Sequence, residues 1–359
     1  MIGSRVLQGI GSAILAGTAM AILTSVYPPR ERGKALGLQV AAVYTGLSLG
    51  PSLGGLLTQY FGWRSIFYFS LPLGIITIVA VLWKLKGEWA EARGERFDIA
   101  GSVMYGGSLI ALMYGLSKLP LALGIWLVVI GILGVATFAW WESRSPSPVL
   151  NTRLFSQNAV FALSNVAALV NYSATSAVSF LLSLYLQYIK GFSPRDAGLV
   201  LIIQPVVMAV LSPLAGRLSD KIEPRILASA GMAITTAGLV LLVFLKEGTG
   251  LAFIMATLAV LGLGFALFSS PNSNAVMSSV ERRHYGVASG TLGTMRLTGQ
   301  MFSLGIAMLL FALYMGQVQI TPERYPLFLS SIRTGFIIFA ALCFGGVFAS
   351  LGRGKTRAQ

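Results

Sequence analysis

The chain has 359 residues, of which 55% are hydrophobic and only 11% are charged, and its mean hydropathy is +0.77. Water-soluble domains carry about twice that share of charged residues, so this composition indicates a protein that crosses a membrane many times. The formal net charge is +14, which in a soluble protein would point to nucleic acid as a partner. In a membrane protein the positions of the charges relative to the apolar runs decide their meaning.

About eleven apolar runs are long enough to cross a bilayer as helices. The polar loops between them are short, and none could hold a soluble domain. We therefore predict an all-α polytopic membrane protein with the bilayer as its surroundings. The predicted spans are 2–27, 35–61, 65–83, 99–117, 120–141, 158–189, 197–215, 225–245, 251–277, 287–315 and 327–351.

Basic residues are distributed unevenly between the two sets of alternating loops. One set, together with the C-terminal tail, carries 17 of the 26 Lys and Arg residues, the other carries 6, and Arg5, Arg296 and Arg333 fall within spans. Because cytoplasmic loops are enriched in Lys and Arg, the basic set is predicted to be cytoplasmic. We expect a multi-pass protein of the plasma or inner membrane with a cytoplasmic C-terminus and no nucleic-acid partner.

The first predicted span begins with a polar strip formed by Arg5, Gln8, Gly9 and Gly11. An arginine at the centre of a membrane helix costs about 2.5–3.5 kcal/mol, so Arg5 requires a partner or a watery cavity. Residues 5, 8 and 11 lie near one another on the helix surface and could point into a bundle. Alternatively, Arg5 extends toward the lipid headgroups near the N-terminus.

The second predicted span carries a glycine pattern that is unusual for its regular spacing. Glycines spaced four apart share one helix face and leave a groove for a neighbouring backbone, while a proline bends the helix at that groove. A general packing helix rich in small residues is the alternative. The residues of the pattern are Gly46, Gly50, Pro51, Gly54 and Gly55.

Polar and aromatic side chains on the later spans are candidates for a substrate cavity. Several of them follow one face of the span 158–189, and a mixture of amide, aromatic and Met groups suits bulky amphipathic compounds. Each residue taken singly could instead form a hydrogen bond between helices. The candidates are Asn165, Asn171, Tyr172, Gln187, Gln204, Asn272, Arg296 and Gln300.

A charged motif follows the span 197–215. Its aspartate and first arginine could pair with each other or with the end of a neighbouring helix, and either contact would latch a cytoplasmic gate. A solvated basic loop is the alternative. The motif residues are Gly216, Arg217, Asp220, Lys221 and Arg225.

These patterns together resemble one family of transporters. The strip Arg5-x2-Gln8-Gly9-x-Gly11 resembles the fourth helix of the major facilitator superfamily, in which the arginine is associated with proton coupling. Gly46-x3-Gly50-Pro51-x2-Gly54-Gly55 resembles the antiporter motif of the fifth helix, and the motif at 216–225 resembles the second copy of the cytoplasmic loop motif. The spans 99–117 and 120–141 resemble the extra helix pair of the fourteen-helix drug:proton antiporter branch.

The resemblance implies a major facilitator fold and export of hydrophobic or amphipathic drugs by proton antiport with alternating access. It also implies that the first three helices of the family are absent. We expect the remainder of an N-terminal bundle over 1–86, the inserted helix pair and its cytoplasmic loops over 87–157, and a six-helix C-terminal bundle over 158–359. Small lipophilic substrates and protons are the implied partners.

The twelve acidic residues all fall in predicted loops or at span ends. Proton coupling relies on a group within the membrane that titrates, and arginine does not titrate. Two alternatives to an active exporter therefore stay open: an inactive truncated remnant, or one part of a split transporter completed by a separately encoded three-helix piece. The sequence contains no convincing nucleophile, metal-ligand or nucleotide-binding pattern, so we expect no enzyme activity, cofactor or metal.

Overall fold

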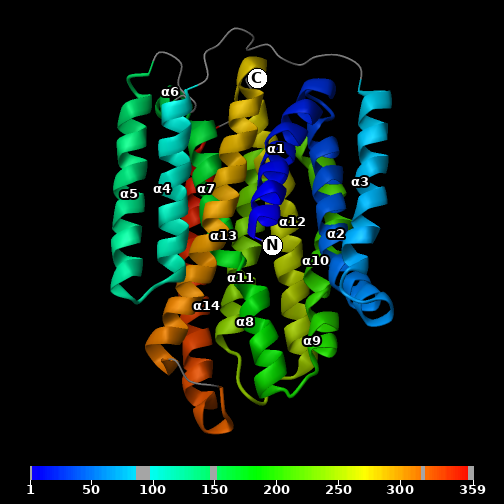
Figure 1. Ribbon diagram of the computed structural model, residues 1–359, viewed down its shortest axis with the longest axis vertical. Coiled ribbons are helices and arrows are strands. Elements are labelled where there is room, and N and C mark those ends of the chain that lie inside the picture. Colours follow the sequence, from blue (N-terminus) through cyan, green and yellow to red (C-terminus); the bar gives the residue numbers. More distant parts are fainter. Residues whose placement is uncertain (1, 86–97, 146–151, 317–319, 355–359) are drawn as a thin grey trace.

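The computed structural model describes residues 2–85, 98–145, 152–316 and 320–354 (Figure 1). Within these ranges the chain forms long helices that run side by side between two ends of the protein. We call the end at which the last helix terminates the C side and the opposite end the far side. The helices are α1 (Ile2–Val26), α2 (Arg32–Phe61), α3 (Ser65–Lys84), α4 (Ile99–Ser117), α5 (Ala122–Glu142), α6 (Thr152–Gln157), α7 (Ala159–Thr175), α8 (Val178–Leu184), α9 (Pro194–Leu201), α10 (Ile203–Ser219), α11 (Pro224–Val243), α12 (Leu251–Ser278), α13 (Tyr285–Met315) and α14 (Tyr325–Gly352).

Ten helical stretches within the described residues are long and apolar enough to cross a membrane. Two of them are composite: α7, α8 and a π-helical turn form the stretch Ala159–Ile189, and α9 and α10 form Pro194–Ser219. The remaining long helix, α2, lies alongside them against α10 and α12. The predicted all-α polytopic architecture is confirmed, and each of the eleven predicted spans coincides with one helical stretch to within a few residues.

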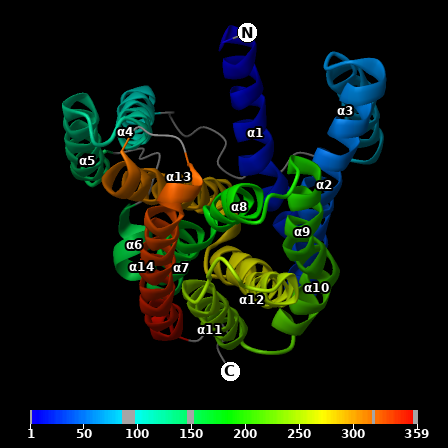
Figure 2. The same cartoon turned by 90° about the horizontal axis from the view of Figure 1, so that it is seen from below.

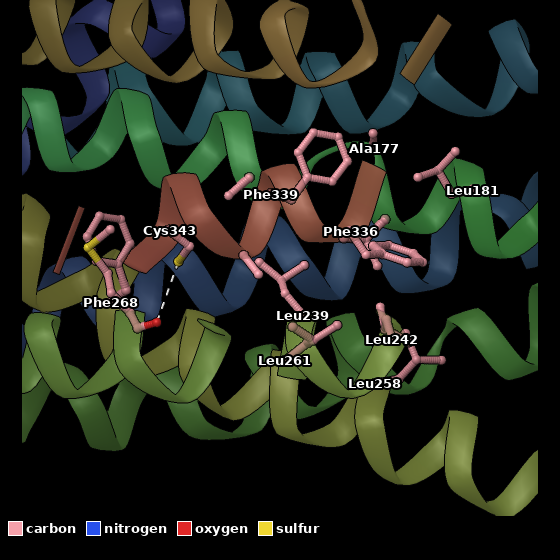
Figure 3. Packing of buried hydrophobic residues seen from close by; sticks show 14 of the residues in the cluster. Ala177, Leu181, Leu239, Leu242, Leu258, Leu261, Phe268, Phe336, Phe339 and Cys343 are labelled. Atoms are coloured by element: carbon pink, nitrogen blue, oxygen red, sulfur yellow. Dashed lines mark hydrogen bonds between the residues drawn. The ribbon is translucent and has the colours of Figure 1, made fainter. Parts of the chain in front are cut away.

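The helices from α7 to α14 enclose a closely packed apolar interior (Figure 3). Phe336 and Phe339 of α14 lie among leucines of α11 and α12, and both rings are completely buried. Between α11 and α12 the two backbones are in contact, because a Cβ added at Gly231 would lie 2.6 Å from the carbonyl oxygen of Gly264. Close approach at small residues is how helices associate in lipid, and it makes this part of the protein a firm scaffold.

The pair formed by α4 and α5 packs tightly on itself and touches the rest of the protein at α13. A Cβ added at Gly131 would lie 2.7 Å from the backbone nitrogen of Leu112, so the two helices meet without intervening side chains. At the C side, Asp98 caps α4 by accepting a hydrogen bond from the Gly101 backbone (2.8 Å), and it also accepts one from the indole of Trp141 (3.0 Å). These bonds lower the pKa of Asp98, and they fasten the end of α5 to the start of α4.

The leading helices are far more exposed than the helices that follow them. Helix α3 has no buried residue, and most of α1 is exposed apart from its C-side end, where it contacts α13. Seen along the helix axes, α1 and α3 project away from the other helices (Figure 2). Helices α1, α2 and α3 also contact one another less than α2 contacts α10. Their apolar side chains are therefore left for lipid or for further helices to cover.

Candidate functional site

Three aromatic rings meet about halfway along the helices and join α2 to the scaffold. Tyr44 of α2 and Tyr172 of α7 both pack edge to face on Phe265 of α12, with ring centroids 5.9 Å and 5.2 Å apart. Met208 of α10 is buried against the same group. Tyr44 lies roughly 18 Å along α2 from its C-side start, which is close to the middle of a bilayer-spanning helix. We call these four residues the aromatic cluster.

A positively charged side chain stands beside the aromatic cluster. The guanidinium of Arg296, on α13, lies 5.7 Å from the ring centre of Tyr172 and donates a hydrogen bond of 2.6 Å to the hydroxyl of Ser273. Its Nε atom is buried and has no hydrogen-bond partner among the described residues. Within the described part of the chain, Arg296 thus has only neutral partners, and part of its hydrogen-bonding capacity is unused.

The predicted cavity residues fall at several depths and do not form one lining. Tyr172 and Arg296 meet at the aromatic cluster. Asn171 precedes Tyr172 in the sequence and is completely buried. Neither its amide nitrogen nor its amide oxygen has a hydrogen-bond partner among the described residues. Asn165 donates a hydrogen bond to the Phe161 carbonyl one turn earlier.

The other candidates lie elsewhere. Gln187 is in the π-helical turn, where it donates to Ser183, and Gln204 is nearly buried on α10. Gln300 is half-buried on α13. Asn272 belongs to a different network: it accepts a hydrogen bond of 2.7 Å from Arg353 at the C side.

Sequence reasoning missed Tyr44, Phe265 and Met208 as members of a central group. A single aromatic or Met residue in an apolar span has the same pattern as ordinary packing, so no local signal marks it. The signal that could have found them is their equal depth, since each lies about three turns from the C-side end of its helix. That comparison requires knowing which helices are neighbours.

The C-side ends of α2 and α10 are held together by a carboxylate. Asp220 accepts hydrogen bonds from the backbone nitrogens of Gly33 (2.7 Å) and Lys34 (2.8 Å) in the first turn of α2. The first N–H groups of a helix have no partner within the helix and carry the positive end of its dipole. Asp220 thus makes one of the two predicted contacts, the one with the end of a neighbouring helix.

Glycines allow this close contact between α2 and α10. A Cβ added at Gly37 would lie 2.5 Å from the carbonyl oxygen of Ser212, and one added at Gly216 would run into the carbonyl of Gly33. No side chain longer than hydrogen fits at either position without separating the helices. The two backbones are therefore in direct contact over about one turn, and Gly216 of the predicted motif is part of that contact.

Further contacts between the leading helices and the scaffold gather toward the same side. Arg32 lies over the ring of Tyr285, 5.3 Å from its centre, and the hydroxyl of Ser270 donates to the carbonyl of Gly33 (3.4 Å). An open pocket of about 650 Å³ lies beside these contacts. Its lining residues are Pro29, Arg30, Glu31, Lys34, Arg217, Asp220 and Lys221. Arg225 lies in the first turn of α11, on the other side of the loop.

The glycine groove predicted on α2 contains no other helix among the described residues. A Cβ added at Gly46, Gly50 or Gly54 would meet nothing within 4 Å, and the same holds for Gly9 and Gly11 of α1. Gln8 is exposed on α1. The predicted site residues Arg5, Pro51 and Gly55 belong to these helices, but their surroundings lie outside the described residues.

Asp220→Asn is expected to loosen the first turn of α2. The amide that replaces the carboxylate loses the negative charge and one acceptor, and hydrogen bonds to a charged group contribute about 1.5–3 kcal/mol. Hydrogen–deuterium exchange of the Gly33 and Lys34 amides should become at least tenfold faster. Glu31→Gln is the matched control, because Glu31 adjoins the same helix start without capping it through its side chain. Equal protection of these amides in Asp220→Asn and in the parent would contradict the role of Asp220.

The sequence and the fold were compared with those of known proteins. Residues 1–140 and 165–358 match the sequence model of the Major Facilitator Superfamily. The chain is 30% identical over 352 residues to the riboflavin transporter RibZ of Clostridioides difficile, which covers 97% of this chain and 76% of RibZ. It is also 30% identical over 315 residues to the multidrug resistance protein Stp of Mycobacterium tuberculosis, which covers 85% of this chain. The chain spans only 57% of the length of Stp.

A solved structure shares the fold. It is that of the human organic anion transporter TETRAN, which matches this chain with a TM-score of 0.70 at 14% sequence identity. The match covers 98% of this chain and 70% of the TETRAN chain. The expected fold is thereby confirmed, while an identity this low says nothing about the substrate.

Proposed function

Because the chain belongs to the major facilitator superfamily, we propose that it exports hydrophobic or amphipathic compounds, drugs included, by antiport with protons. The observation that carries this proposal is the placement of the central site relative to the gate. The aromatic cluster lies at mid-depth, while the contacts between α2 and α10 lie at the C side. A central site closed toward one side is what alternating access requires.

We propose that the C side faces the cytoplasm of a cell with a plasma or inner membrane. The excess of Lys and Arg in the loops of that side supports this orientation. The contacts of Asp220 and Gly216 then form a cytoplasmic gate, and the aromatic cluster faces outward in this conformation. Transport requires these contacts to break and re-form in each cycle, so they act as a latch.

The chemistry of the central site favours a bulky amphipathic cargo. Aromatic rings and a thioether offer apolar contacts that tolerate many shapes. Arg296 offers its unused N–H donors to one acceptor group of the cargo. We propose that Arg296 orients the cargo while the aromatic cluster holds its apolar part.

Proton coupling is proposed to involve the strip on α1. Arg5, Gln8, Gly9 and Gly11 match the family pattern associated with that role. Among the described residues, the carboxylates lie near helix ends, so a proton carrier at mid-depth would have to come from a segment that contacts α1. The exposed glycines of α1 and α2 support the presence of such a contact.

We therefore propose that further transmembrane helices cover α1, α2 and α3 in the working transporter. The chain would then divide into the remainder of an N-terminal bundle over 1–86, an inserted pair over 87–157 and a C-terminal bundle over 158–359. Glycines with nothing within 4 Å of an added Cβ and the absence of buried residues in α3 support this arrangement. The alternative is an inactive remnant, or half of a split transporter.

The test is dye transport into or out of proteoliposomes with an imposed pH gradient. The chain is purified alone and together with any three-helix segment encoded directly upstream of its first codon, in any reading frame. Proton-driven movement of a lipophilic dye that is lost in Arg296→Gln supports the proposal. Movement with the chain alone would contradict the need for further helices. A folded protein that moves no dye in either arm would overturn export.

A further inference from the structure

One arginine of the transmembrane region takes no part in the central site or the gate. Arg333 lies on α14, eight residues after its start, or roughly 12 Å into the helix. Its side chain is exposed on the same helix face as Ile337, Phe344 and Phe348, which are each at least half exposed. Exposed apolar residues on a transmembrane helix contact lipid, so Arg333 also faces the lipid.

Arg333 makes no hydrogen bond or ion pair with the residues that the structure describes. A charged side chain within a membrane is costly, and such residues pair with an opposite charge or reach the interface. Glu247 lines the same pocket, but no ion pair joins it to Arg333 among the described residues. An anionic partner from outside the described chain would offset the cost of this charge.

Arg333 lines a pocket of about 400 Å³ on the far side, between the start of α14 and the loop that joins α11 to α12. A second cation, Lys246, lines the pocket from the loop, and the acidic residue of the lining is Glu247. Apolar residues and a hydroxyl complete it. The lining residues are Leu245, Lys246, Glu247, Gly248, Pro326, Leu329, Ser330 and Arg333.

The loop that carries Lys246 is fixed by the helices behind it. The hydroxyl of Tyr185 donates a hydrogen bond of 2.7 Å to the carbonyl of Lys246, and the ammonium of Lys190 donates one of 2.6 Å to the carbonyl of Glu247. The backbone nitrogen of Lys246 is bonded within the loop to the hydroxyl of Thr249 (2.8 Å). The pocket wall is thus held in place before any ligand arrives.

We propose that this pocket binds the phosphate of an anionic phospholipid from the leaflet of the far side. Arg333 would hold the phosphate through its planar fork of N–H donors, and Lys246 would add a second positive charge. The acyl chains would run along the exposed face formed by Ile337, Phe344 and Phe348. A lipid fits better than a soluble anion, because Arg333 lies on the same exposed face of α14 as these apolar residues.

The excess of one positive charge in the lining predicts a preference between lipid classes. Arg333 and Lys246 outweigh Glu247, so a lipid with a net negative headgroup, such as phosphatidylglycerol, should be held more strongly than zwitterionic phosphatidylcholine. The interaction lies partly in a medium of low dielectric constant, so salt should weaken it less than a surface contact.

The protein is reconstituted in vesicles of phosphatidylglycerol and phosphatidylcholine in equal amounts, and the retained lipid is identified by native mass spectrometry. We expect the parent to retain more phosphatidylglycerol, and Arg333→Gln to lose at least half of this excess. Arg324→Gln is the matched control, because Arg324 lies at the same end of α14, is partly exposed and does not line the pocket. Its lipid retention should equal that of the parent.

Three results would overturn the proposal: no preference for phosphatidylglycerol in the parent, equal losses in Arg333→Gln and Arg324→Gln, or displacement of the lipid by millimolar inorganic phosphate. The last result would assign the pocket to a soluble anion. If Arg333→Gln fails to fold, Lys246→Gln tests the same pocket from the loop. Dye transport is not the readout, so a failure of the proposed export leaves this test unaffected.

Discussion

Gly216→Leu is expected to remove most of the transport activity. A Cβ at position 216 would run into the carbonyl of Gly33 and would lie 2.9 Å from the Cα of Gly37. Both are backbone atoms of α2, so they cannot turn aside as the end of a flexible side chain could. Leucine would therefore force α2 and α10 apart at the C side. Overpacking of this kind costs about 1–3 kcal/mol, which favours the state with α2 and α10 apart by roughly 5- to 150-fold.

The matched control for this variant is Gly198→Leu. Gly198 belongs to the same membrane span as Gly216, but it is exposed and an added Cβ would meet nothing within 4 Å. Dye transport and the exchange rate of the Gly33 amide are measured for both variants in the form of the protein that transports. Gly216→Leu should lose transport and exchange faster, while Gly198→Leu should match the parent. Normal transport by Gly216→Leu would mean that this contact is not part of the cycle.

The helices themselves could be predicted, because an uninterrupted apolar run of bilayer length has few other structures open to it. The faces of helices could be predicted in part, as the burial of Asn165, Asn171 and Tyr172 on α7 illustrates. Which helices would be neighbours could not be predicted. The periodicity of a sequence gives the polar face of a helix, but it does not say what that face meets.

Two residues illustrate this limit. Asn272 was expected in the substrate cavity because it is polar and lies on an apolar span, yet its oxygen accepts a hydrogen bond from Arg353. Arg353 follows the last apolar run and has the pattern of a solvated tail residue, yet only 1% of it is exposed. Its hydrogen-bond partners Ser164 and Asn272 belong to α7 and α12, which lie far from it in the sequence.

The contact between α2 and α10 at the C side was predictable from one of its two sides only. An acidic residue at a helix end indicates contact with a helix start, and Asp220 has that contact. Its partners are backbone N–H groups at Gly33 and Lys34, and any residue but proline supplies such a group. Gly33 and Gly37 are spaced four residues apart, as Gly46 and Gly50 are, but Gly33 precedes the predicted span 35–61, so the pair was not recognised as a packing face.

Arg353→Leu is expected to destabilise the scaffold by about 3 kcal/mol, because the loss of three hydrogen bonds from a charged donor is partly offset by no longer having to desolvate the guanidinium. The guanidinium donates to the hydroxyl of Ser164 (3.0 Å), to the amide oxygen of Asn272 (2.7 Å) and to the hydroxyl of Ser350 (2.7 Å). Burial lowers the pKa of Arg353 to about 10, an effect that the charge of Glu223 partly offsets. The side chain is therefore still a cation at neutral pH, and it ties α7, α12 and α14 together.

Arg283→Leu provides the comparison, because it removes the same charge from the same side of the protein. Arg283 pairs with Glu281 at 3.0 Å, but both side chains are more than half exposed, and such surface pairs contribute about 0–1 kcal/mol. Thermal unfolding in detergent should show a clear fall in the midpoint for Arg353→Leu and almost none for Arg283→Leu. Among the described residues, the guanidinium has neutral hydrogen-bond partners and its Nε has none. Equal midpoints in the two variants would mean that burying this guanidinium costs as much in desolvation as its three hydrogen bonds contribute.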